Sequence, residues 1–194
     1  MSKPLLNPPE NGLTIVHPLD DFYARAGQPL PPLNQLDGED VPEPYKSLLV
    51  HLNDMTPTLE KFHGRSIHLQ VLGRRRAGDD YFREVVLRLD GTNEPVEFGA
   101  IKIHLGLFPE AAREQILLER LPLGHILQEY RIKHTSRPRA FLRMASDRLI
   151  NDVLSLSGAR VLYGRRNTHL DPHQRPLAEI VEILPPAGPA HDRA

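Results

Sequence analysis

The stretch YFREVVLRL, residues 81–89, decides the fold, because its alternation predicts a β-strand with one apolar face. That face contains Val85, Leu87 and Leu89, and it also contains Arg83. A guanidinium keeps its proton, so an arginine on an apolar face needs a fixed anionic partner or a route to solvent. From the strand alone, Arg83 either reaches solvent at the strand end, pairs with a structural carboxylate or binds an anionic ligand.

Other stretches around this strand show strand or helix periodicity. Alternation predicts strands over residues 66–72, 96–105, 140–144, 161–170 and 177–184. Helical spacing predicts helices over residues 18–26, 45–52, 109–118 and 146–154, with two short helices after Thr56 and Pro122. Ser146 or Asp147 is expected to cap the last of these helices. Because the strands do not alternate regularly with helices, we expect an α+β fold with an antiparallel sheet.

One globular domain is expected to span residues 45–186. Before it, residues 1–44 are rich in proline and are interpreted as an extended arm with one short helix. After it, residues 187–194 lack periodicity and are interpreted as a flexible tail.

The composition argues against several classes of partner. Basic and acidic residues nearly cancel, at 24 against 25, and tryptophan is absent, so we expect no nucleic-acid partner. The basic cluster at residues 74–76 is interpreted as a solvated hairpin tip. No cysteine is present, which removes thiol chemistry and thiolate metal sites. No apolar leader or membrane-length stretch occurs, so we expect a cytoplasmic protein without membrane insertion. The oligomeric state does not follow from these features.

Ten histidines raise the question of a metal site. His63 with His68, and His169 with His173, lie in no paired-ligand motif on a helix. We therefore expect no metal site. The glycines form neither a P-loop nor a dinucleotide-binding motif, so nucleotide binding is not indicated either.

Two segments share a design that suits an anionic ligand. In one, Thr56 precedes Pro57 at a helix start, and in the other Pro122 precedes Leu123 and Gly124. The first amides of a helix have no partner within it, and the helix dipole adds partial positive charge, so a carboxylate is a natural guest. Gly124 would let a ligand approach the backbone. Plain capping is the alternative explanation for each segment.

Charged residues also occur in the last two predicted strands. Arg165 and Arg166 are adjacent, so one guanidinium faces each side of the sheet, and one of them is a candidate second anion clamp. Glu179 and Glu182 also fall on opposite faces. If both faces are covered, at least one of these carboxyl groups is poorly hydrated and its pKa is raised, as a general acid requires. A structural Arg–Glu bridge across the sheet is the alternative.

In their order along the chain, these motifs resemble those of the chorismate lyase family. The matching segments are Asp54-Met55-Thr56, the strand that contains Arg83, Pro122-Leu123-Gly124, Leu162-Tyr163-Gly164-Arg165-Arg166, and Glu182 close to Pro185. The resemblance covers roughly residues 45–186. It implies a six-stranded antiparallel sheet flanked by helices, with the ligand buried beneath flap-like segments. It also implies an enzyme that converts chorismate to 4-hydroxybenzoate and pyruvate without a metal or organic cofactor.

The resemblance further implies roles for individual residues. Arg83 would grip the ring carboxylate of the substrate, helped by the backbone amides of Met55 and Leu123. Glu182 would be the catalytic carboxyl group near the scissile ether, with Glu179 as the fallback. The predicted substrate-binding set is completed by Thr56, Gly124, Arg165 and Arg166.

Other functions remain compatible with these residues. The first is a non-catalytic protein that binds a small aromatic carboxylate in the same pocket. The chorismate lyase fold also serves as the effector-binding domain of some transcription regulators, but no winged helix precedes the domain in this sequence. An interaction domain that uses the Pro-rich arm ranks last, because residues 29–32 lack flanking basic residues.

Overall fold

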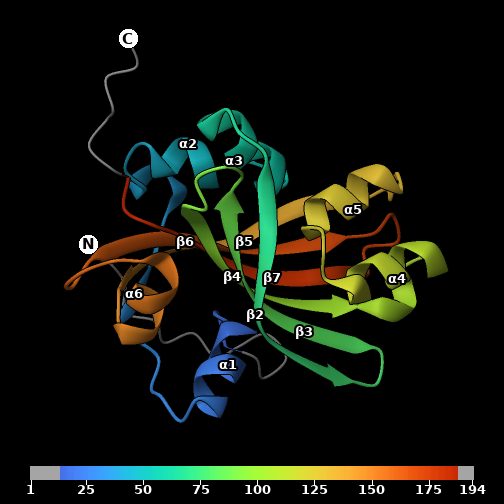
Figure 1. Ribbon diagram of the computed structural model, residues 1–194, viewed down its shortest axis with the longest axis horizontal. Helices are drawn as coiled ribbons and strands as arrows, with labels where there is room; N and C mark the ends of the chain where they lie inside the picture. Colours follow the sequence, from blue (N-terminus) through green and yellow to red (C-terminus); the bar gives the residue numbers. More distant parts are fainter. Residues whose placement is uncertain (1–13, 188–194) are drawn as a thin grey trace.

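The computed structural model describes residues 14–187, which form one antiparallel sheet with helices on both faces (Figure 1). Its strands are β1 (Leu33–Leu36), β2 (Ile67–Ala77), β3 (Asp80–Leu89), β4 (Pro95–His104), β5 (Thr135–Ala145), β6 (Val161–Leu170) and β7 (Pro176–Leu184). They lie in the order β1-β5-β6-β7-β4-β3-β2, and all neighbouring pairs are antiparallel. The expected α+β fold is confirmed, but the sheet has seven strands instead of the expected six.

The strand that the sequence did not predict is β1, a four-residue edge strand in the Pro-rich segment. It pairs with β5 only, and Pro32, just before it, accepts a hydrogen bond from the amide of Ala145. Four residues are too few to show a clear alternation. An edge strand also needs hydrogen bonds on one side only, so it tolerates neighbouring prolines.

Helices cover both faces of the sheet (Figure 1). They are α1 (Leu19–Arg25), α2 (Tyr45–Leu49), α3 (Met55–His63), α4 (Glu110–Leu118), α5 (Leu123–Glu129) and α6 (Arg148–Leu154), with short 3-10 turns at Gly38–Asp40 and Leu105–Leu107. Helices α1 and α6 lie on one face, and α2 to α5 lie on the other. Asp147 caps α6, since its Oδ1 accepts from the amide of Ile150 at 2.9 Å. Within residues 14–187, no helix is long and apolar enough to cross a bilayer.

The hydrophobic core is continuous on one face of the sheet and divided on the other. Under α1 and α6, a single cluster includes Leu19, Phe98 and Ile150. The opposite face carries one cluster beneath α4 and α5 and a second cluster beneath α2 and α3. The apolar residues of that face therefore form two separate regions.

The described part of the Pro-rich segment packs onto the same sheet. Leu19 and Tyr23 of α1 are buried in the core cluster of that face. The domain boundaries predicted from the sequence remain predictions, and the parts of them that concern residues 1–13 and 188–194 lie outside the described residues.

Candidate functional site

A cavity lies between the sheet and the starts of α3 and α5, between the two apolar clusters of that face. Its lining residues are Asp54, Met55, Thr56, Leu69, Arg83, Val85, Leu87, Glu97, Gly99, Ile101, Pro122, Leu123, Gly124, His169, Ile180 and Glu182. Its volume is about 50 Å³, whereas pockets for drug-sized ligands hold about 300–1,000 Å³. The cavity as it stands is therefore smaller than a ligand of that size requires.

A row of paired residues forms the floor of the cavity. Val85 on β3 lies opposite Gly99 on β4, which in turn lies opposite Glu182 on β7. Gly99 has no side chain, and a Cβ atom there would lie 3.2 Å from Glu97 Oε1 and 3.2 Å from Val85 Cγ2. The glycine therefore keeps the centre of the floor open.

Arg83 lies on β3 and faces this cavity with its side chain buried, at 1% exposure. Its Nε and Nη1 atoms have no hydrogen-bond partner among the described residues. Nearby Tyr81 donates its hydroxyl to Glu119, so that carboxylate is engaged elsewhere. Burial lowers the pKa of Arg83 to about 10, although Tyr81 and Glu119 oppose this shift, and the guanidinium remains charged at neutral pH. Arg83 thus neither reaches solvent nor forms an ion pair within residues 14–187.

Arg165 lies on β6 and is also buried, at 0% exposure, but all three of its nitrogens are bonded. Nε donates to Oε2 of Glu182. Nη1 donates to the carbonyl oxygens of Leu49 and His51, both at 3.2 Å. Nη2 donates to the carbonyl oxygen of Asn53 at 3.2 Å. Arg165 therefore fastens the loop between α2 and α3 to the sheet, and it does not line the cavity itself.

Glu97 on β4 is a cavity residue that the sequence analysis did not select. It is buried, and its Oε2 has no hydrogen-bond partner among the described residues. Burial raises the pKa of Glu97 well above its usual value, repulsion by Glu182 raises it further, and Arg165 partly opposes both. The protonated form of Glu97 is therefore favoured. Its place in an alternating row with Gly99 and Ile101 was a signal available from the sequence.

The two predicted helix starts meet over the cavity. Met55 and Thr56 at the start of α3, and Leu123 and Gly124 at the start of α5, all line it. A Cβ atom on Gly124 would lie 3.1 Å from Oγ1 of Thr56. The missing side chain of Gly124 therefore permits the close approach of the two helices, whereas the sequence suggested the approach of a ligand.

Arg166 and Glu179 lie on the opposite face of the sheet, away from the cavity. Arg166 Nη2 donates to Glu179 Oε1 at 3.1 Å, and Lys102 Nζ lies 3.8 Å from Glu179 Oε2. The predicted Arg–Glu bridge across the sheet thus exists on both faces, as Arg166–Glu179 and as Arg165–Glu182. Of the two candidate carboxylates, Glu182 faces the cavity.

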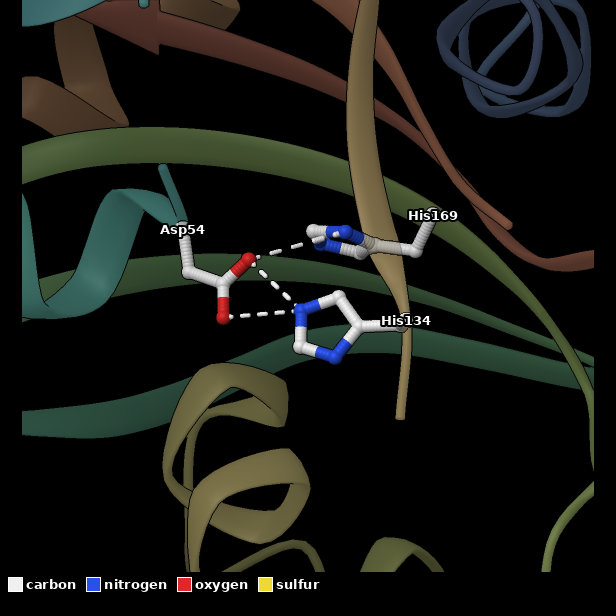
Figure 2. A group of neighbouring side chains, drawn as sticks. All are labelled: Asp54, His134 and His169. Carbon is white, nitrogen blue, oxygen red and sulfur yellow. Dashed lines mark hydrogen bonds and ion pairs between the residues drawn. The ribbon is translucent and has the colours of Figure 1, made fainter. Parts of the chain in front are cut away.

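Asp54, His134 and His169 form a polar cluster at one wall of the cavity (Figure 2). His134 Nε2 lies 2.9 Å from Asp54 Oδ1 and 3.0 Å from Oδ2, and His169 Nδ1 lies 3.7 Å from Oδ1. The sequence analysis missed this cluster because its members are 80 and 35 residues apart along the chain, and no local motif connects them.

Burial and charge shift the pKa values of all three residues. Burial lowers the pKa of His169 to about 4, with Asp54 opposing the shift. The hydrogen bond that His134 shares with Asp54 raises the pKa of His134, against the effect of its burial. For Asp54, burial favours the neutral acid, but the hydrogen bond from His134 and the neighbouring positive charges outweigh it and lower the pKa. The cluster is therefore built around an ionised Asp54.

Comparison with known proteins identifies the fold. No protein-family model and no curated protein matches the sequence. The effector domain of PhnF from Mycobacterium smegmatis aligns with a TM-score of 0.52 and 12% identity, over 69% of this chain and 88% of that domain. A Staphylococcus aureus gene product, SA0254, aligns with a TM-score of 0.51 and 11% identity, over 65% and 86% of the two chains. Similarity at such identities shows the fold alone.

Two further structures align over similar shares of this chain. A longer PhnF chain aligns with a TM-score of 0.52 and 12% identity over 71% of this chain and 65% of its own length, so the similarity covers about two thirds of that chain. A ligand-binding domain from Bordetella bronchiseptica, described as part of a GntR-family transcriptional regulator, aligns with a TM-score of 0.45 and 15% identity over 62% and 86% of the two chains.

These comparisons correct two predictions from the sequence. One matched structure with a TM-score above 0.5 is named an effector domain, and none of the eight structures compared is named a lyase. The identification as a chorismate lyase that releases 4-hydroxybenzoate and pyruvate was therefore wrong. The exclusion of nucleic acid as a partner is corrected as well, because in PhnF this fold is an effector domain within a longer chain, and the composition of one domain does not decide what such a longer chain binds.

Proposed function

We propose that this chain is an effector-binding domain that holds a small organic anion in the cavity beneath α3 and α5. The observation that carries this proposal is Arg83, a buried guanidinium that faces the cavity and has no ion-pair partner within residues 14–187. A buried charge without a partner destabilises a fold, so its retention calls for another role.

An anionic group of a ligand would supply the missing partner of Arg83. A carboxylate or phosphate can accept two parallel hydrogen bonds from one guanidinium, and Nε and Nη1 of Arg83 are both available for such a pair. The nearby start of α3 adds partial positive charge, since Met55 and Thr56 lie at its first turn and line the same cavity. The apolar lining, including Leu87 and Ile101, suits the rest of an organic ligand.

Several features favour binding over catalysis. Glu182, the carboxyl group that the sequence analysis assigned to proton transfer, is held by Arg165 through a buried ion pair. One structure that shares the fold, from PhnF, is named an effector domain. In a regulator, occupation of such a cavity would change how a DNA-binding domain, on this chain or on another, engages its operator.

The proposal can be tested by thermal unfolding and calorimetry with a panel of small carboxylates, the matching phosphate monoesters and the neutral alcohols. We expect at least one acid or ester to stabilise the chain, since a ligand that binds only the folded state raises its melting temperature. Its neutral alcohol should not. In Arg83→Met, binding of the same ligand should weaken by about 30-fold or more, because a buried charge pair typically contributes at least about 2 kcal/mol.

Arg166→Met is the matched control, because Arg166 is an arginine on the same sheet that faces away from the cavity. It should bind the ligand as the wild type does. Equal binding by the wild type and Arg83→Met would refute the role of Arg83. Failure of every acid and ester to stabilise the wild type would refute the proposed ligand class.

A further inference from the structure

Asp54, His134 and His169 bring three potential metal ligands together from three distant parts of the chain (Figure 2). One carboxylate oxygen and one ring nitrogen from each histidine all lie within 4.8 Å of one another. Asp54 directly precedes α3, His134 directly precedes β5, and His169 lies within β6. Each ligand is therefore held on, or at the end of, a regular element.

The backbone contact of His134 orients this imidazole as a ligand. Its Nδ1 lies 2.9 Å from the carbonyl oxygen of Ile132. A carbonyl oxygen can only accept, so Nδ1 carries a proton, and the neutral ring then directs the lone pair of Nε2 at the carboxylate of Asp54. Metal-bound histidines usually make this same outer hydrogen bond. A proton, carried by His134 or by Asp54, or a cation must therefore lie between Nε2 and the carboxyl group.

His169 distinguishes these two explanations. A second proton on His134 would account for its contact with Asp54, but it would leave Nδ1 of His169 unsatisfied. That atom is buried and has no hydrogen-bond partner among the described residues, although it lies 3.7 Å from Oδ1 of Asp54. Buried polar atoms are nearly always satisfied. A cation between the three side chains would satisfy this one.

The side chain of Asp54 also does not form the capping hydrogen bond that is usual for an aspartate at its position. Asp54 occupies the N-cap position of α3, with an extended backbone. An aspartate at this position usually accepts from the amides of the first turn, which stabilises a helix by about 1 kcal/mol. The carboxylate points instead toward the two histidines (Figure 2).

We infer that Asp54, His134 and His169 bind a divalent transition-metal ion, with Zn²⁺ as the model case. Zinc bonds of about 2.0–2.2 Å in a tetrahedral site place neighbouring ligand atoms roughly 3.3 Å apart. The two distances from Asp54 Oδ1, 2.9 Å to His134 and 3.7 Å to His169, lie on either side of this value. Two imidazoles also favour Zn²⁺ over Mg²⁺ or Ca²⁺, which prefer oxygen ligands.

The surroundings of the cluster are compatible with an added cation. The one arginine that acts electrostatically on both Asp54 and His169 is Arg165, whose charge is balanced by Glu182. A second, outer groove provides a path for the ion, since Asp54 and His134 line it from the solvent side. Asp54 also lines the inner cavity, so an ion at this cluster would adjoin both spaces. This inference does not depend on the proposed ligand of Arg83.

Another group of potential ligands within residues 14–187 serves as an internal comparison. His17, Asp20 and Asp21 also lie close together, but their ligand atoms are already engaged. His17 Nδ1 lies 3.1 Å from Asp20 Oδ1, and Arg75 donates to Asp21 Oδ2 at 2.9 Å. This group contains no unsatisfied buried nitrogen, so no metal site is inferred there.

The test uses the full chain, dialysed against a chelator and then titrated with ZnCl₂ by calorimetry, with bound zinc measured after gel filtration. We expect one Zn²⁺ per chain and a higher melting temperature with zinc than without it. Loss of a ligand in Asp54→Asn or His134→Gln should weaken binding by roughly 100-fold or more, because even changes outside the ligand sphere cost about 10- to 100-fold. MgCl₂ should not substitute for ZnCl₂.

Two variants control for incidental histidine–carboxylate contacts. Asp20→Asn alters the comparison group, and His68→Gln alters an exposed pair in which His68 Nδ1 lies 2.7 Å from Asp90 Oδ1. Both should retain one Zn²⁺ with unchanged affinity. If the wild type retains no zinc, the cluster is a histidine–aspartate ion pair and the inference fails. If zinc binds equally well to Asp54→Asn and His134→Gln, the site lies elsewhere and the inference also fails.

Discussion

Two arginines are buried on the same face of the sheet, but they differ in their hydrogen-bond partners. Arg165 on β6 donates to Glu182 and to three backbone carbonyl groups at the end of α2 and in the loop before α3. Arg83 on β3 leaves Nε and Nη1 without any partner among the described residues. The first arginine is satisfied within the described residues, whereas the second would, on our proposal, be satisfied by a bound anion.

The comparison shows why burial alone does not separate a structural arginine from a binding arginine. Removing a bonded arginine leaves its partners unsatisfied, whereas removing an unbonded arginine relieves the fold of an uncompensated charge. Stability and ligand affinity should therefore respond oppositely at the two positions. The following substitutions test this difference.

The largest effect on stability is expected for Arg165→Met. This change leaves Glu182 as an unpaired buried carboxyl group and removes the donors for three carbonyl groups. The free energy of unfolding should fall by about 3–5 kcal/mol, as is typical when one partner of a buried ion pair is lost. Urea unfolding followed by circular dichroism measures this loss. A loss below about 1 kcal/mol would mean that Arg165 is not the anchor of the loop.

The opposite result is expected for Arg83→Met. The substitution replaces an unpaired guanidinium by an apolar side chain of similar length, so the free energy of unfolding without ligand should rise by about 1–3 kcal/mol. Stabilisation by the ligand should disappear at the same time. Urea unfolding with and without ligand measures both effects. A strong destabilisation would place Arg83 beside Arg165 as a structural residue and remove the contrast between them.

A third test concerns Glu97, whose carboxyl group lies on the same face. Its pKa is raised in the folded state, so its contribution to stability is complete below about pH 4.5 and is lost as pH rises through the folded pKa. Glu97→Gln keeps a neutral side chain at every pH. The free energy of unfolding of the variant should therefore rise relative to that of the wild type as pH increases above about 4.5, by at most about 1.4 kcal/mol per pH unit. Melting temperatures from pH 4 to 8 measure this gain, and parallel curves for the two proteins would contradict it.

The smallest effect is expected for Arg166→Met on the opposite face. Its partner Glu179 is partly exposed and also lies 3.8 Å from Lys102 and 3.7 Å from His104, so favourable contacts remain after the change. The free energy of unfolding should fall by about 0.5–1 kcal/mol, in the range of partly exposed ion pairs. Ligand affinity should not change. Reduced affinity in calorimetry would show that the two faces of the sheet are energetically linked.

Much of the fold could be predicted from the sequence because its signals are local. Alternation placed six of the seven strands, and Pro57, Pro122 and Asp147 marked helix starts that the structure contains. The strand that was missed, β1, is defined by its pairing with β5 and has no strong alternation of its own. Local patterns reveal strands that have a buried and an exposed face, but not short edge strands.

The site could be predicted only in part. Period-two reasoning placed Arg83 and Glu182 on covered faces, and the structure brings both to one cavity together with Met55, Thr56 and Leu123. It could not tell which of Arg165 and Arg166 faces the cavity side, because adjacent residues on a strand are equivalent until the covering helices are known. No short stretch of sequence contains more than one residue of the cluster of Asp54, His134 and His169, so no local motif predicted it.

By itself, the sequence determined that this chain forms an α+β antiparallel sheet and that Arg83 points from a strand toward an apolar face. Periodicity along one strand suffices for both conclusions. Only the tertiary structure decided that Arg83 has no partner within residues 14–187, whereas Arg165 has four. Partners of a side chain come from segments that are distant in sequence, and their identity depends on how strands pair and how helices pack. For the same physical reason the fold could be predicted more fully than the function. The fold depends largely on patterns among neighbouring residues, whereas the site depends on residues that only folding brings together.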